Sequence, residues 1–234
     1  GNTSIWHYYT GGCCPINAST STPATVDRHT LTSGPGLDTF GLFPIVAPDG
    51  GNFSLKLGNN KVGSQSEKAR YYVHVPPGAV DFSLIYRFAV VLEDPGHGVS
   101  VQPRFEVRAY DSFTTGALPC FQFAYVAATT IPGFYNSTID TTVRCRGWST
   151  GSINLSGFSG KTVIIDFASG DCGLGAHFGY GYLDMSYGLF AIKTVACDSD
   201  SITLIGPTGF NVYKWFDSST GVLVDTNRST RVPK

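Results

Sequence analysis

The chain has 234 residues, of which 42% are hydrophobic and only 14% charged, and its formal net charge is −1. So little net charge creates no field that would recruit nucleic acid or anionic lipid, and neither partner is expected. Its apolar runs are far shorter than the roughly 18 residues that a membrane-spanning helix needs. The first residues lack the charged and apolar segments of a signal peptide, so we expect a mature or trimmed product.

β-Rich segments follow one another along the chain, separated by turn signals such as Asp49-Gly50-Gly51 and Pro95-Gly96. Only Ser64–Arg70 could hold a helical turn. Many strands without crossover helices predict an antiparallel sandwich or barrel. The predicted strands are Ile5–Tyr9, Asn52–Leu57, Ala69–Val75, Phe82–Leu92, Pro103–Tyr110, Phe121–Val126, Ser152–Leu155, Thr162–Phe167, His177–Asp184 and Tyr187–Thr194.

Two features of the pattern bear on the layout of the domain. The run Phe82–Leu92 is apolar on both faces, which predicts a central strand. The composition changes near Cys197, after which short strands surround Trp215. We therefore assign residues 1–195 to one β-domain and 196–234 to linker strands or a partial second domain. The alternative is that the last strands complete the first domain.

An even count of six cysteines in a chain rich in Gly, Ser and Thr predicts disulfides and an oxidising compartment. The first expected pair is Cys120 with Cys145, which flank a loop, and the second is Cys14 with Cys172. We expect Cys13 and Cys14 to face different partners rather than each other. The alternative is that the thiols are free and buried.

Catalytic signatures are absent from the sequence, which contains no GxSxG, HExxH or phosphate-binding glycine loop. The spacing of the cysteines is not that of a zinc ribbon. His177 lies five residues after Cys172, but we expect that thiol in a disulfide rather than in a Cys–His dyad. The segment Glu93–His97 is interpreted as a turn, the alternative being a carboxylate that serves a metal or a glycan hydroxyl. The chain is therefore predicted not to be an enzyme.

The densest stretch is Asp171–Asp184, in which glycines and aromatic residues lead to a carboxylate. Glycine inside a strand indicates a bulge or a close approach of backbones. A carboxylate late in a strand, facing glycine-rich turns, suits calcium, so we expect one structural Ca²⁺. Its candidate ligands are Asp184, Asp27, Asp38 and Asp49. Alternatively, Asp184 caps a turn or pairs with an arginine.

Five aromatic residues could form a surface on which sugar rings stack. The candidates are Trp6, Tyr8, Tyr9, Tyr135 and Trp148. The alternative is that these rings belong to the core or to cross-strand pairs.

Several motifs in a fixed order carry a family resemblance over roughly residues 28–190. The chain resembles the jelly-roll module of large Bacteroidota surface proteins that are linked to gliding motility and exported by the type 9 secretion system. The resemblance implies an antiparallel jelly-roll β-sandwich, similar to MAM-type and carbohydrate-binding modules. Residues 206–216 look like the start of an Ig-like or PKD-like domain. The matching stretches are Gly51–Gly58, Phe82–His97, Gln102–Asp111, Trp148–Leu155 and Asp171–Asp184.

The leading functional hypothesis is a structural or adhesive module of a large secreted cell-surface protein, outside the cell. Its expected partners are neighbouring domains of the same chain, identical molecules or surface glycans. One alternative is a glycan-binding module, which would present two or more exposed aromatic rings on one face with polar neighbours. The other alternative is an accessory domain of a secreted hydrolase.

Overall fold

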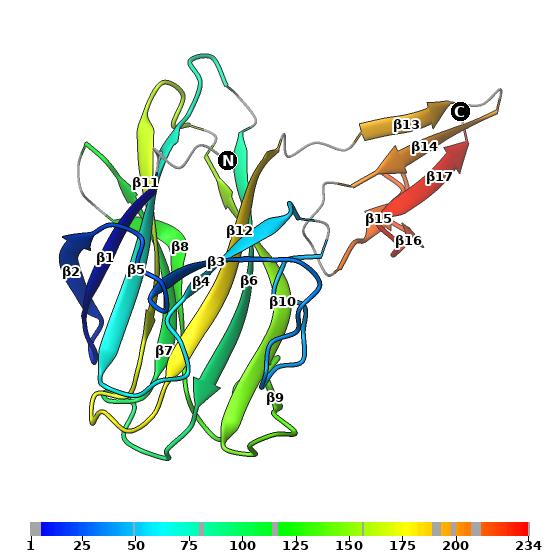
Figure 1. Cartoon of the computed structure of the whole chain (residues 1–234). Helices are drawn as coiled ribbons and strands as arrows, with labels where there is room; N and C mark the ends of the chain where they lie inside the picture. Colours follow the sequence, from blue (N-terminus) through cyan, green and yellow to red (C-terminus); the bar gives the residue numbers. More distant parts are fainter. Residues whose placement is uncertain are drawn as a thin grey trace.

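The computed structural model describes residues 6–48, 50–79, 82–113, 117–155, 157–188, 193–197, 200–206 and 212–233 (Figure 1). Twelve of their strands form two six-stranded sheets. Sheet A has the order β2 (Asn17–Thr22), β1 (Trp6–Gly12), β5 (Gln65–His74), β11 (Thr162–Gly170), β7 (Arg104–Asp111) and β8 (Ala117–Val126). Sheet B has the order β3 (His29–Ser33), β4 (Phe53–Leu57), β12 (Gly179–Gly188), β6 (Ser83–Glu93), β10 (Val143–Asn154) and β9 (Tyr135–Asn136).

The two sheets face each other as a jelly-roll β-sandwich, and the predicted fold class is confirmed (Figure 1). From β4 to β7, and again from β10 to β12, the chain changes sheet at every strand. All strand pairs within both sheets are antiparallel. Across the described residues, no helix is long and apolar enough to span a membrane.

The helical turn considered for Ser64–Arg70 is wrong, because these residues run into strand β5. β5 pairs with β1 on one side and with β11 on the other. Its buried residues, among them Ala69 and Tyr71, alternate with the less buried Lys68 and Arg70. This period of two fixes the strand, since it places one set in the core and the other on the outer face.

Strand β6 lies between β12 and β10 and confirms the prediction of a central strand at Phe82–Leu92. One of its faces contributes Phe88 to the core between the sheets, where the Phe88 ring lies 6.0 Å from that of Phe105. Its other face contributes Ala89 and Val91 to a second apolar cluster. Because both faces are covered, the strand is apolar along its length.

The glycines of Asp171–Asp184 lie where backbones approach closely, as predicted. A Cβ atom on Gly179 would lie 2.6 Å from the carbonyl oxygen of Gly170, and one on Gly181 would lie 2.5 Å from the Phe105 ring. Only glycine fits at such separations. These two residues therefore let β12 pass close to sheet A.

The expected disulfide pairs are wrong in this structure. Cys13 is bonded to Cys14, whereas Cys145 and Cys172 are free and buried. Cys145 lies on β10 of sheet B and packs into the second apolar cluster, while Cys120 lies on β8 of sheet A. The two residues thus belong to different layers, and their closeness along the chain does not make them neighbours. The side chain of Cys120 lies outside the described ones.

The C-terminal strands form two small sheets of their own, which lie to one side of the sandwich (Figure 1). The first pairs β14 (Ser201–Ile205) with β13 (Lys193–Cys197) and β17 (Ser229–Pro233). The second pairs β15 (Trp215–Phe216) with β16 (Leu223–Asp225). Within the described ranges, none of these strands pairs with a strand of the sandwich.

Candidate functional site

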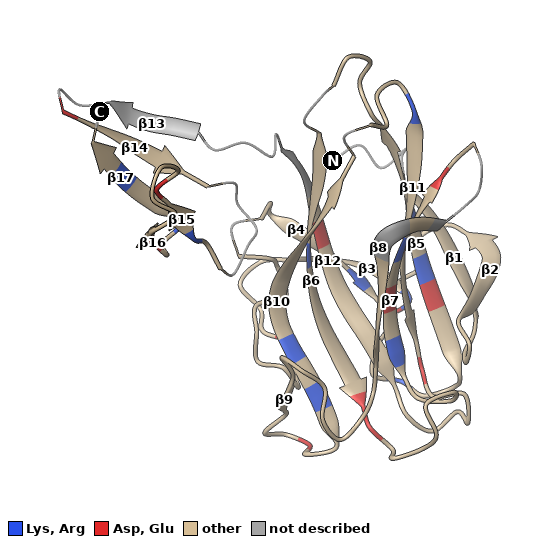
Figure 2. Ribbon diagram, turned by 180° about the vertical axis from the view of Figure 1, so that it is seen from behind, with Lys and Arg blue, Asp and Glu red and all other residues tan. Residues whose placement is uncertain are grey.

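The outer face of sheet A concentrates charged side chains in a chain that has few of them. Lys68 and Arg70 lie on β5, Asp166 on β11, and Glu106 and Arg108 on β7. Figure 2 shows the charged positions of these neighbouring strands. None of these residues was predicted as functional. The available signal was the alternation of charge in the sequence of β5 and β7, since alternate residues of a strand share a face.

Ion pairs hold most of these side chains in place. Arg70 donates two hydrogen bonds to the Asp166 carboxylate, of 2.6 and 2.8 Å, and Lys68 Nζ lies 3.8 Å from the same carboxylate. Arg108 donates a 2.6 Å bond to Glu106. The bond to Asp166 raises the pKa of Arg70, and burial lowers the pKa of Lys68 against the attraction of Asp166. The ion pairs therefore hold hydrogen-bond donors and acceptors in fixed positions on the outer face of sheet A.

Aromatic rings complete this surface. Lys68 Nζ lies 4.3 Å from the centroid of the Tyr9 ring, and the Arg70 guanidinium lies 5.5 Å from it. Both distances are typical of cation–π contacts. Tyr110, on β7, adds a second half-buried ring to the same face. The charged groups of β5 and β11 thus lie between a ring on β1 and a ring on β7.

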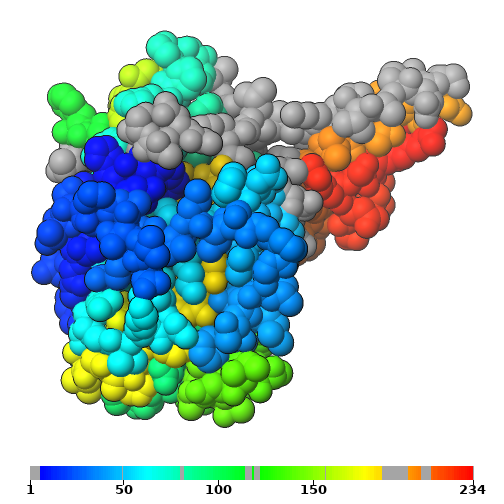
Figure 3. Space-filling view, viewed as in Figure 1, coloured from blue at the N-terminus to red at the C-terminus, as the bar shows by residue number. Residues whose placement is uncertain are grey.

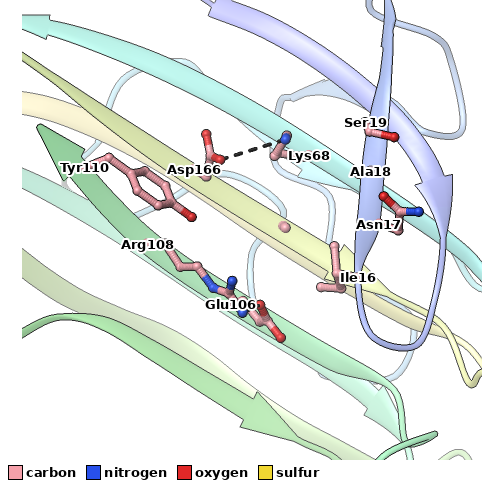
Figure 4. Close-up of a pocket in the computed structure, with 10 residues that line it drawn as sticks. Ile16, Asn17, Ala18, Ser19, Lys68, Glu106, Arg108, Tyr110 and Asp166 are labelled. Atoms are coloured by element: carbon pink, nitrogen blue, oxygen red, sulfur yellow. Dashed lines mark hydrogen bonds and ion pairs between the residues drawn. The ribbon is translucent and has the colours of Figure 1, made fainter. Parts of the chain in front are cut away.

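A groove of about 170 Å³ is open on this face (Figure 4). Figure 4 shows Tyr110, Asp166 and Lys68 on three strands, with Asn17 at the side of the β1–β2 hairpin. The lining of the groove is mostly polar, with a few apolar residues such as Ala168. The groove is lined by Ile16, Asn17, Ala18, Ser19, Lys68, Glu106, Arg108, Tyr110, Asp166 and Ala168.

The outer face of sheet B is not open, because residues 36–47 cover it (Figure 3). The buried Asp38 carboxylate accepts 2.9 Å hydrogen bonds from the hydroxyls of Tyr180 and Tyr182, and it also accepts the backbone N–H groups of Phe40 and Gly41. Burial raises the pKa of both tyrosines, and the charge of Asp38 raises it further. The covered face and the segment over it therefore form a second core.

The five predicted sugar-stacking residues do not form one platform. Trp6 and Tyr8 pack against the core between the sheets. The Tyr135 hydroxyl donates to the Gly41 carbonyl, and Trp148 Nε1 donates a 2.6 Å bond to the Pro44 carbonyl, so both hold the covering segment. Only Tyr9 belongs to the open face of sheet A.

The predicted calcium ligands that the structure describes each have different neighbours. Asp27 is exposed and pairs with Lys61 at 2.6 Å, whereas Asp38 is buried against the two tyrosines. Asp184 accepts a 3.2 Å hydrogen bond from the Gly51 N–H, which matches the alternative that it caps a turn. Asp49 lies outside the described residues. Calcium binding near Asp184 stays a prediction.

The acidic groups of Glu93–His97 are structural in their contacts. Glu93 accepts the Phe178 N–H at 3.2 Å, and Asp94 accepts Gln102 Nε2 at 2.9 Å. Asp94 also lies 3.5 Å from Arg144. These bonds tie the β6–β7 loop to its neighbours, and Asp94 is buried among them.

One group of side chains has donors suited to a metal. A thiol and two imidazoles, from Cys172, His97 and His177, place one ligand atom each within 4.8 Å of one another. It is the only such group of three among the described residues. Because Cys172 was expected in a disulfide, the sequence did not predict this group. The spacing of Cys172 and His177 was its only visible signal.

No family model matches the chain, and no curated protein matches it. Solved structures with similar shape include a Family 11 carbohydrate-binding module of the Clostridium thermocellum cellulase Lic26A-Cel5E, at 9% identity and a TM-score of 0.33, over 82% of this chain and 91% of that one. Another is TmCBM61 in complex with β-1,4-galactotriose, at 8% identity and a TM-score of 0.36, over 78% and 88%.

A third is the K3 cleaved adhesin domain of Lys-gingipain from Porphyromonas gingivalis W83, at 14% identity and a TM-score of 0.31, over 70% and 92%. The enzymatically active domain of bacteriophage CBA120 tailspike protein 4 matches at 14% identity and a TM-score of 0.37, over 80% of this chain and only 20% of that one. None of these proteins shares enough sequence with the chain to transfer a ligand or an activity to it.

Proposed function

We propose that the chain is a non-catalytic glycan-binding module and that the outer face of sheet A is its binding face. The observation that carries the proposal is the open groove lined by Lys68, Asp166 and Arg108 (Figure 4). Ligand sites combine a concave surface with a few fixed polar groups and aromatic rings. The groove has all three features.

The chemistry of the lining favours a neutral polyhydroxylated ligand. Acidic and basic groups alternate on the face, so it presents no run of one sign to a polyanion. A sugar hydroxyl both donates and accepts, and therefore suits a surface where carboxylates lie beside cations. Both carboxylates of the groove are paired with arginines, which favours a role as hydrogen-bond acceptors.

The test starts with binding of the 234-residue chain to an array of polysaccharides and oligosaccharides, followed by calorimetry with the best ligand. Lys68→Ala and Arg108→Ala should each weaken binding roughly 10- to 100-fold, since a hydrogen bond to a charged group contributes about 1.5–3 kcal/mol. The matched control is Lys161→Ala, which removes an exposed lysine outside the groove. Binding that is absent across the array, or equally strong in all three variants, would refute the proposal.

We further propose that the module is part of a larger secreted surface protein of the gliding-motility type. The motifs Phe82–His97 and Asp171–Asp184 support this through the resemblance described above, and the Cys13–Cys14 disulfide supports an oxidising compartment. A full reading frame with tandem Ig-like repeats and a C-terminal sorting domain would agree with it. Deletion of the module that leaves attachment and surface movement unchanged would contradict it.

A further inference from the structure

The cluster of His97, Cys172 and His177 lies at the end of the sandwich and shares no residue with the lining of the groove. His97 comes from the β6–β7 loop, and the other two come from the β11–β12 loop, which lie together at the lower end of Figure 1. Cys172 Sγ lies 3.4 Å from His97 Nδ1. The two imidazole rings have centroids 5.2 Å apart and stand nearly perpendicular, at 82°.

These separations are close to those of a metal site. Bonds of about 2.0–2.3 Å to nitrogen and sulfur place tetrahedral donors about 3.5 Å apart. The Cys172–His97 pair already has this separation, and all three donors lie within 4.8 Å. Small rotations of the imidazoles would bring the third donor into place.

The state of His177 points independently to a ligand. Its Nδ1 atom is buried and has no hydrogen-bond partner among the described residues. A buried polar atom without a partner is destabilising by about 1–3 kcal/mol and is rare in folded proteins. Cys172 is fully buried as well, while both histidines are partly exposed, so an ion could enter from the histidine side.

The surroundings hold the three residues firmly. The Cys172 N–H donates a 2.9 Å bond to the His177 carbonyl, which closes the loop between them, and the Leu174 N–H lies 3.4 Å from Cys172 Sγ. The Gly173 N–H donates a 2.8 Å bond to the Val101 carbonyl and so joins the two loops. Such bonds preorganise metal ligands.

The Cys13–Cys14 disulfide supports the same loop from the other side. Cys14 Sγ lies 3.1 Å from the carbonyl oxygen of Asp171, the residue before Cys172. The Asp171 carboxylate in turn accepts the N–H groups of Gln65 and Gly179, each at 3.1 Å. Because Cys13 and Cys14 are bonded to each other, the Cys172 thiol is free and stays available as a ligand.

We propose that His97, Cys172 and His177 form a binding site for a zinc ion, with a fourth position open to water. Two imidazoles and one thiolate are the donor types that zinc prefers, whereas calcium and magnesium require oxygen. The buried thiol loses its proton on binding, which makes the affinity fall at low pH.

The experiment uses the whole chain after chelator dialysis without reductant, so that the Cys13–Cys14 bridge stays intact. Calorimetry with Zn²⁺ should give one ion per chain, and Cys172→Ser and His97→Ala should weaken binding roughly 100-fold. His74→Ala, which removes an exposed histidine at the end of β5, is the matched control and should bind as the wild type does.

Co²⁺ provides a second readout that reports the ligands directly. The wild type should show the intense thiolate-to-cobalt charge-transfer band of a tetrahedral site, and Cys172→Ser should lack it. If Cys172→Ser does not fold because the residue is buried, His97→Ala, which changes a residue in a loop, provides the test instead. Wild-type protein that binds less than a stoichiometric amount of Zn²⁺, or variants that bind Zn²⁺ as tightly as wild type, would overturn the site.

Discussion

The two sheets are built from strands of the same kind, but their outer faces differ. The outer face of sheet A has an open groove, whereas that of sheet B is covered by another segment of the chain. On sheet A, Lys68, Asp166 and Arg108 line an open groove. On sheet B, the segment 36–47 folds over Tyr180 and Tyr182 and makes a second core. A strand face thus becomes a surface for recognition only where no other segment covers it.

One carboxylate on each outer face shows the same difference in its surroundings. Asp38 is a carboxylate that receives four hydrogen bonds in the interior, from two hydroxyls and two backbone N–H groups. Asp166 pairs with Arg70 and Lys68, whose side chains remain partly exposed. The first arrangement stabilises the fold, whereas the second places charged groups where a ligand can meet them.

The largest effect on stability should come from Asp38→Ala. The substitution leaves two buried tyrosine hydroxyls and two N–H groups without their acceptor, and we expect a loss of about 3–5 kcal/mol in the free energy of unfolding. Urea denaturation measures it, and the covering segment should become accessible to protease. A loss below about 1 kcal/mol would show that the covered face is not a second core.

A second effect concerns Glu67, a carboxylate between the sheets that pairs with Arg28 and accepts a bond from Ser169. Burial raises its pKa from 4.5 to about 7, against the opposing effect of Arg28. The folded protein therefore binds this proton more tightly than the unfolded chain. Its contribution to stability is complete below about pH 4.5 and is lost as the pH rises through about 7.

We expect Glu67→Gln to remove this loss, which is on the order of 3 kcal/mol between pH 4.5 and pH 8. The neighbouring Asp171, with its pKa raised by burial to about 6, adds a loss of the same sign in both proteins. His29, whose pKa burial lowers, acts in the opposite direction, since its stability contribution is lost as the pH falls below 6.5. Denaturation curves of the wild type and of Glu67→Gln between pH 4.5 and pH 8 measure this difference. An identical pH dependence of the two proteins would contradict the raised pKa of Glu67.

The sequence predicted the layers of the molecule better than the sites. Alternation and the two-sided apolar run of β6 follow from local patterns, so the sandwich and its central strand could be inferred. Lys68, Glu106 and Asp166 meet only because β11 lies between β5 and β7, and nothing local in the sequence encodes that order.

The cysteine predictions failed for a related reason. The partner of a thiol depends on which face of which sheet it occupies, and Cys145 turned out to face the covered side of sheet B. His97 and Cys172 lie in separate loops that are joined by backbone bonds such as Gly173 to Val101. Contacts of this kind arise from the tertiary fold and have no short-range signature.

The smallest effect on stability should come from Arg108→Ala on the open face. The Arg108 side chain is 52% exposed and makes one 2.6 Å bond to Glu106. Exposed ion pairs contribute only about 0.2–1 kcal/mol, so the free energy of unfolding should change by no more than that. Glycan binding should nevertheless fall, since the same guanidinium lines the groove.

Arg108→Ala and Asp38→Ala therefore form a crossed pair, measured by urea denaturation and by ligand calorimetry under the same conditions. The open-face variant should lose affinity and keep its stability, because its guanidinium contacts solvent and not the core. The covered-face variant should lose stability, and at temperatures where it remains folded its affinity should stay near that of the wild type. If Arg108→Ala unfolds as readily as Asp38→Ala, the charges of sheet A are structural, and the contrast between the two faces disappears.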